Sequence, residues 1–213
     1  MTERLETVQF PGPAGRLEGL WKPGAEPVRG SAVFAHPHPL FGGTLHSKVV
    51  YRAARALVGA GYSTLRFNFR GVGGSEGTHD EGRGETEDVR AAFDEAQRRG
   101  GLPIVAGGFS FGSAAALRAS AGDSRIAAFL GIGLPLSSDS AFGLETPRIP
   151  ALFVTGERDT FGPPDALRAW AHTGAASRVV IVPGADHFFA GHLEELERTV
   201  AAFLANLAVP SRP

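Results

Sequence analysis

Short apolar runs alternate with amphipathic segments along most of this chain. The apolar runs have the length of strands and occupy residues 31–35, 63–69, 103–107, 125–131, 151–156 and 178–182. The segments with a helical period of apolar positions occupy residues 47–60, 82–99, 113–121, 163–173 and 190–207. Buried strands separated by amphipathic helices are typical of a parallel sheet with helices on both faces. The pattern therefore predicts an α/β fold with a doubly wound, mostly parallel sheet and right-handed crossovers.

The N-terminal residues follow a different pattern. Residues 5–10 and 16–21 alternate apolar and polar positions and are joined through Pro11-Gly12-Pro13. This pattern predicts an antiparallel hairpin at the edge of the sheet. No linker, internal repeat or low-complexity tract interrupts the remaining chain, and 213 residues suit one α/β domain with a sizeable core. We expect a single domain over residues 1–209 and a C-terminal tail at 210–213.

The most informative stretch is a Gly-x-Ser-x-Gly pentapeptide at residues 108–112, centred on Ser110. It follows one predicted strand and precedes a small-residue helical run, which is the strand–turn–helix context that exposes a nucleophilic serine. Glycines on both sides of the serine allow neighbouring chain to pack where a Cβ would not fit. The pentapeptide alone is weak evidence in a chain with 29 glycines. Its place between a strand and a helix makes the prediction specific.

A nucleophilic serine needs a histidine base and an acid that orients the base. When the chain order is serine, acid, histidine, both partners follow the nucleophile and each comes just after a strand. Asp159 follows the apolar run 151–156, and His187 follows the run 178–182. Because the carboxyl ends of parallel strands meet at one edge of the sheet, we expect Ser110, Asp159 and His187 to converge there.

Other residues of the same types compete for the two partner roles. Asp139 and Asp186 are alternative acids, although Asp186 adjoins the predicted base and would have difficulty turning onto the Nδ1 atom of its own neighbour. His172 and His192 are alternative bases, but both fall on predicted helices and are expected at the surface.

Composition narrows the class of protein. Hydrophobic residues make up 43% and charged residues 20% of the chain, as in ordinary globular proteins. The net charge is −1, from 21 basic and 22 acidic residues, so no basic field favours nucleic acid. Cysteine is absent, which excludes a disulfide framework and a cysteine nucleophile. The N-terminus lacks a signal-peptide pattern, and no apolar run has membrane-spanning length, so we expect a cytoplasmic protein.

Beyond the serine pentapeptide, several stretches are typical of one family. They are residues 34–43 (FAHPHPLFGG), 66–75 (RFNFRGVGGS), 156–159 (GERD) and 184–187 (GADH). With these stretches the chain resembles, over nearly its whole length, the α/β-hydrolase superfamily and, within it, small lidless bacterial hydrolases near the dienelactone-hydrolase branch. The resemblance implies the α/β-hydrolase fold and acyl-ester chemistry, and it does not imply a substrate.

An oxyanion hole would complete such a site. One donor is expected to be the backbone N–H of Phe111, the residue after the nucleophile. The other should come from the loop after the strand at 31–35, where the prolines have no N–H and His38, Leu40 and Phe41 remain. The resemblance to a His-Gly-x pattern, with proline in place of glycine, favours Leu40.

The histidines after the strand at 31–35 and the glycines after the strand at 63–69 each have an alternative interpretation. His36, His38 and His46 contain an H-x-H spacing that could indicate a metal site, but no carboxylate accompanies them, and the resemblance places them in the oxyanion loop. The glycine-rich stretch at 71–74 resembles a dinucleotide-binding loop, but Glu76 stands where the third glycine belongs. We therefore expect no metal and no cofactor.

The interval from residue 133 to residue 149 is too short and loop-like for a helical cap, so the site is expected to be shallow and open. The sequence thus predicts a serine hydrolase that cleaves carboxylic ester or thioester bonds of small substrates, as a monomer or homodimer. An acyltransferase or peptidase with the same three residues and a non-enzymatic binding protein on this fold remain alternatives.

Overall fold

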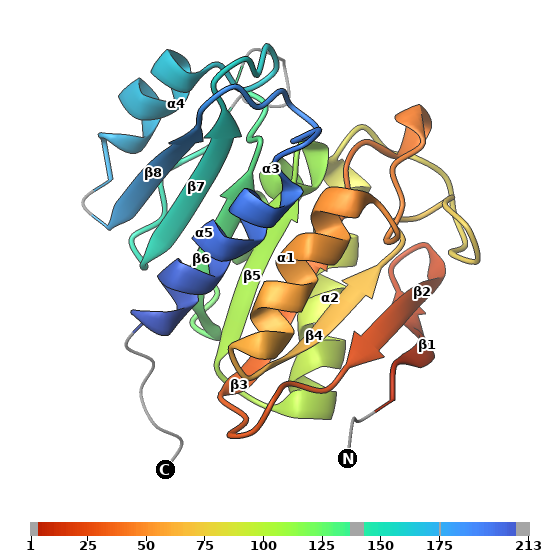
Figure 1. Cartoon of the computed structure of the whole chain (residues 1–213). Coiled ribbons are helices and arrows are strands. Elements are labelled where there is room, and N and C mark those ends of the chain that lie inside the picture. The colour runs from red at the N-terminus through yellow and green to blue at the C-terminus, as the bar shows by residue number, and fades with distance from the viewer. Residues whose placement is uncertain (1–3, 137–142, 175, 208–213) are drawn as a thin grey trace.

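The computed structural model describes residues 4–136, 143–174 and 176–207. In these ranges the chain forms an eight-stranded sheet in the order β1-β2-β4-β3-β5-β6-β7-β8 (Figure 1). The strands are β1 (Glu6–Gly12), β2 (Gly15–Lys22), β3 (Gly30–Ala35), β4 (Tyr62–Phe67), β5 (Ile104–Phe109), β6 (Ile126–Ile132), β7 (Ala151–Gly156) and β8 (Ser177–Val182).

The predicted sheet topology is confirmed. Strands β3 to β8 pair in parallel with one another. The hairpin of β1 and β2 is antiparallel and joins the edge of the sheet through an antiparallel pairing of β2 with β4. The inner strands β3, β4, β5 and β7 are buried along their whole length, as their continuous apolar runs require.

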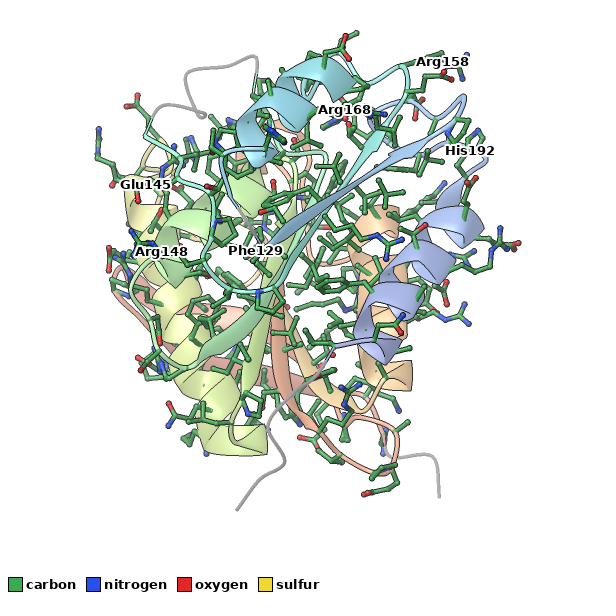
Figure 2. All side chains as sticks on the ribbon, turned by 90° about the vertical axis from the view of Figure 1, so that its left-hand side faces the viewer. Phe129, Glu145, Arg148, Arg158, Arg168 and His192 are labelled. Atoms are coloured by element: carbon green, nitrogen blue, oxygen red, sulfur yellow. The ribbon has the colours of Figure 1, made fainter. Side chains whose placement is uncertain are left out.

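Helices cover both faces of this sheet. The longer helices are α1 (Lys48–Gly59), α2 (Arg83–Gly100), α3 (Phe111–Ser120), α4 (Pro164–Ala171) and α5 (Leu193–Ala205). One hydrophobic cluster joins the sheet to α1 and α5, which lie towards the viewer in Figure 1. A second cluster joins the other face to α2, α3 and α4. Figure 2 shows Phe129 of β6 inside this layered core, whereas Arg158 and Arg168 lie at the surface.

The last helix begins later than its apolar period predicts. Helix α5 starts at Leu193 rather than at residue 190, because the preceding residues form a tight loop. In that loop Phe189 and Gly191 have positive φ angles of 55° and 77°, which an α-helix cannot contain. The loop places His187 at the carboxyl edge of the sheet.

The stretch between β6 and β7 contains no helix in its described parts, residues 133–136 and 143–149. Asp139 and the rest of residues 137–142 lie outside the described residues, as does the expected tail at 210–213. Within the described part of the chain, none of the helices has the length and apolar content needed to cross a bilayer.

Candidate active site

The turn between β5 and α3 carries Ser110 in a strained conformation. Its φ and ψ angles are 54° and −124°, which a residue with a side chain rarely adopts. The flanking glycines are required by close backbone packing. A Cβ on Gly108 would lie 2.4 Å from the Gly112 carbonyl, and one on Gly112 would lie 2.3 Å from the His36 carbonyl oxygen. The turn therefore projects the serine side chain at the carboxyl edge of the sheet.

Three loops bring the predicted serine, histidine and aspartate together. His187 Nε2 lies 2.9 Å from Ser110 Oγ, and His187 Nδ1 lies 2.8 Å from Asp159 Oδ2. The three residues follow β5, β7 and β8, as the strand-end argument predicted. The imidazole can therefore exchange a proton with the serine while its other nitrogen is held by a carboxylate.

Asp159 is oriented by several donors. Its Oδ1 accepts the N–H groups of Phe161 and Gly162, both at 2.9 Å, and its Oδ2 accepts the Thr155 hydroxyl at 3.1 Å. Burial by itself raises the pKa of this carboxyl, but the hydrogen bonds from His187 and the two amides outweigh burial and hold the pKa below its ordinary value. The carboxylate is thus charged and fixed at neutral pH.

Aromatic rings surround the imidazole of His187. The ring centroids of Phe161, Phe109 and Phe188 lie 4.7, 5.0 and 5.2 Å from its own. Phe109 is buried, whereas the other two rings are exposed. The imidazole is therefore confined to a narrow range of orientations between Ser110 and the carboxylate.

The loop after β3 is held by a buried histidine. His36 Nε2 accepts the N–H of Phe69 at 3.0 Å, so Nδ1 carries the ring hydrogen and donates to the Pro37 carbonyl oxygen at 2.6 Å. The N–H and C=O of a trans peptide point in opposite directions. The N–H of His38 therefore points away from the buried imidazole.

The three candidate amides of this loop differ in their hydrogen bonding. The N–H of Leu40 donates to the Nδ1 atom of His38 at 3.3 Å, and the N–H of Phe41 donates to the His38 carbonyl oxygen at 3.1 Å. Among the described residues, the N–H of His38 has no hydrogen-bond partner, and neither has that of Phe111 in the first turn of α3. The His38 and Phe111 rings are neighbours, with centroids 4.8 Å apart.

The rival residues lie elsewhere or have other partners. His192 is paired with Glu195 at 3.5 Å, and His172 is exposed at the end of α4. The Asp186 carboxylate accepts two amides of its own loop. The described parts of the chain contain no group of three or more histidine, aspartate or glutamate side chains that could hold a metal ion.

Sequence reasoning missed several residues that position the site. Thr155, Phe161 and Gly162 all contact the Asp159 carboxylate. The signal available in the sequence was a single hydroxyl at the end of an otherwise apolar strand, because Thr155 precedes Gly156 at the end of β7.

Comparison with known proteins identifies the family of this chain. A family model described as an alpha/beta hydrolase domain matches residues 30–209. The chain belongs to the alpha/beta hydrolase family. An uncharacterized protein of Rickettsia prowazekii is 35% identical over 215 residues, which cover 95% of this chain and 90% of that protein.

Solved structures extend the comparison to the lidless members of the family. An alpha-beta serine hydrolase homologue from Coxiella burnetii is 34% identical, covers 98% of this chain and 99% of its own, and superposes with a TM-score of 0.87. A serine hydrolase without a lid from Xanthomonas campestris is 29% identical, covers 100% and 99%, and has a TM-score of 0.88. The suspected resemblance to small lidless bacterial hydrolases is confirmed.

Proposed function

We propose that this hydrolase cleaves carboxylic ester or thioester bonds of small substrates through Ser110, His187 and Asp159. The observation that carries the proposal is the continuous chain of contacts from Asp159 through His187 to Ser110, with distances of 2.8 and 2.9 Å. Family membership and the similarity to serine hydrolases support the hydrolase class.

The proposed reaction proceeds in two halves. His187 Nε2 removes the proton of Ser110 Oγ as this oxygen attacks the carbonyl carbon, and Asp159 stabilises the imidazolium. The tetrahedral intermediate collapses when the imidazolium gives its proton to the leaving alcohol or thiol, which leaves an acyl-enzyme. Water, deprotonated by the same imidazole, then attacks the acyl carbon. The imidazolium returns this proton to Ser110 Oγ as the bond between Oγ and the acyl group breaks and the acid is released.

The developing oxyanion needs preorganised donors. We propose the backbone N–H groups of Phe111 and His38, because both lack a partner among the described residues. The Leu40 amide favoured by the resemblance donates to His38 Nδ1, so His38 replaces Leu40 in this proposal.

Labelling with a fluorophosphonate probe tests the nucleophile directly. We expect the wild-type protein to be labelled at Ser110 and the Ser110→Ala variant to remain unlabelled. The variant should lose on the order of 10³-fold or more in kcat on activated esters, with an unchanged thermal unfolding midpoint. Equal rates in both proteins would exclude the mechanism. Product analysis with an added alcohol or amine acceptor separates hydrolysis from acyl transfer.

A further inference from the structure

Exposed apolar side chains gather at the edge of the sheet that carries Ser110. Among the described residues, the four most exposed large apolar side chains are Phe41, Leu40, Phe188 and Phe161, with exposed fractions of 86%, 68%, 62% and 50%. The first two lie on the loop after β3, and the others follow β8 and β7. Scattered exposed apolar residues are ordinary, but a group around one site indicates binding.

The backbone of its loop holds Phe188 in this exposed position. Asp186 Oδ1 accepts the N–H groups of Phe188 and Ala190, both at 3.0 Å. The next residue, Phe189, has a φ of 55° and is fully buried. A left-handed conformation is costly for a phenylalanine, and here it allows one ring to enter the core while its neighbour stays outside. The exposed ring packs edge-on against Phe109, with centroids 6.3 Å apart.

The backbone of Phe161 is hydrogen-bonded to Asp159, and its ring lies beside His187. Its N–H donates to Asp159 Oδ1 at 2.9 Å, and its ring centroid lies 4.7 Å from that of His187. The ring of Phe188 lies 5.2 Å from the same imidazole. The two exposed rings therefore both lie beside the His187 imidazole. The Phe41 ring instead packs on His38, with centroids 4.6 Å apart.

The chemistry of ester cleavage places the alcohol portion of the substrate beside His187 and its carbonyl oxygen beside the oxyanion donors. The leaving alcohol takes its proton from His187 Nε2, so the alcohol must lie beside the imidazole. The oxyanion lies towards the proposed amides of Phe111 and His38. The loop of His38 follows β3, which lies on the other side of β5 from β7 and β8, the strands that precede the two rings. The alcohol portion therefore meets the rings of Phe161 and Phe188.

Two flat rings on one open wall favour a flat ligand. A flexible alkyl group gains only from the apolar area that it buries against these rings. A planar aromatic group gains additional free energy by offset or edge-on packing against aromatic side chains. We propose that Phe161 and Phe188 bind the alcohol portion of the ester and confer a preference for alcohols that carry a planar aromatic ring. This inference rests on the esterase function proposed above.

Three butyrate esters test the preference. Benzyl, cyclohexylmethyl and ethyl butyrate share one acyl group and have alkoxide leaving groups, and the first two differ in planarity at similar size. We expect kcat/KM of the wild-type enzyme to favour benzyl over cyclohexylmethyl butyrate by about 3- to 10-fold, the range for aromatic packing beyond buried area. Phe161→Leu and Phe188→Leu should each lower this ratio by roughly 2- to 4-fold. Phe188→Tyr retains the ring and should retain the ratio.

Phe41→Leu is the matched control, because Phe41 is exposed at the same edge but packs on the other side of the site. Its ratio should equal that of the wild type. Equal kcat/KM for the two ring esters, or a parallel loss on all three esters in Phe188→Leu, would overturn the inference and leave the esterase function intact. Failure of the wild type to cleave any of the esters would overturn both. If the wild type is a dimer and the variant with both Phe161→Leu and Phe188→Leu dissociates, the rings form an interface between two copies of the chain. That result would also overturn the inference.

Discussion

At the scale of single residues, His36 shows how a buried side chain can control a backbone group. Burial lowers the pKa of this imidazole to about 4, although its hydrogen bond to Pro37 acts in the opposite direction. The neutral ring accepts the N–H of Phe69 and fixes the Pro37 carbonyl. Protonation would turn the accepting nitrogen into a donor that faces another donor, so the charged form is incompatible with this loop.

The depressed pKa predicts a pH-dependent stability. Between pH 6.5 and about 4 the unfolded chain binds a proton at residue 36 and the folded chain does not. The free energy of unfolding should therefore fall as the pH decreases through this window, by at most about 3 kcal/mol. Urea denaturation at several pH values measures this slope. His36→Gln should flatten it, and an equally steep slope in the variant would contradict the assignment.

The Asp159 carboxyl affects stability at lower pH. Its pKa is held below the ordinary value of 3.8, so the stability that it contributes is present above that value and is lost as the pH falls through the folded-state pKa. Asp159 therefore acts at lower pH than His36. Burial also lowers the pKa of His38, so the part of the slope above pH 4 that is lost in His36→Gln is the part that reports on His36.

A proline at residue 38 tests the second oxyanion donor. His38 has φ of −51°, which proline can adopt, so His38→Pro removes the N–H with little change of the backbone. We expect kcat to fall by roughly 10²- to 10³-fold, the usual loss for one oxyanion donor. His38→Ala removes the imidazole and keeps the amide, so its kcat should change much less.

Leu40→Pro is the comparison for this experiment, because the Leu40 amide donates within its own loop. It should retain most of the activity if its thermal unfolding midpoint shows that it is folded. A folded Leu40→Pro variant that loses activity, beside a His38→Pro variant that keeps it, would restore Leu40 as the donor.

At the scale of elements, the β5–turn–α3 unit depends on two glycines. A Cβ on Gly112 would lie 2.3 Å from the carbonyl oxygen of His36, which is backbone and cannot move aside cheaply. Close packing of the helix start on the loop after β3 thus brings the serine and the oxyanion loop together.

Gly112→Ala should therefore damage stability and activity together. We expect a loss of about 1–3 kcal/mol in the free energy of unfolding, as for other overpacked sites, with a fall in kcat. Gly59→Ala in α1 is the matched control, because a Cβ there meets nothing within 4 Å. It should stabilise the protein by about 0.4–1 kcal/mol. Chemical denaturation measures the free energy of unfolding of both variants. Similar changes in Gly112→Ala and Gly59→Ala would contradict the packing argument.

At the scale of the whole molecule, the described residues form no helical lid over Ser110, and this limits the substrate surface that they can bury. The described residues between β6 and β7 contain no helix, and the lidless hydrolase of Xanthomonas campestris superposes over the whole chain. The wall around Ser110 is formed by loop side chains, several of which are exposed.

A chain-length series of acyl esters tests this openness. Each added methylene contributes about 0.8 kcal/mol only when it is buried. We expect kcat/KM to level off at acyl chains of roughly eight carbons, since longer chains extend into water. A steady rise to long chains, or activation at a lipid–water interface, would contradict an open site. Assays below and above the solubility limit of each ester distinguish these outcomes.

The order of the elements, the parallel sheet and the meeting of Ser110, Asp159 and His187 could be predicted from the sequence alone. These features depend on local patterns: apolar runs of strand length, a serine between glycines, and an acid and a histidine each placed just after a strand. Parallel topology then brings strand ends to one edge, so the convergence of Ser110, Asp159 and His187 could be inferred without coordinates. The start of α5 was predicted three residues early, because apolar positions do not reveal a left-handed residue such as Phe189.

Which backbone and side-chain groups remain available at the site depends on the packing of the folded chain. The amides of His38 and Leu40 look equivalent in sequence, yet one donates inside the loop and the other does not. Phe188 and Phe189 are identical neighbours, yet one is exposed and the other is buried. Such differences depend on hydrogen bonds and packing between segments far apart in the chain, as when His36 binds the amide of Phe69, and no local pattern encodes them.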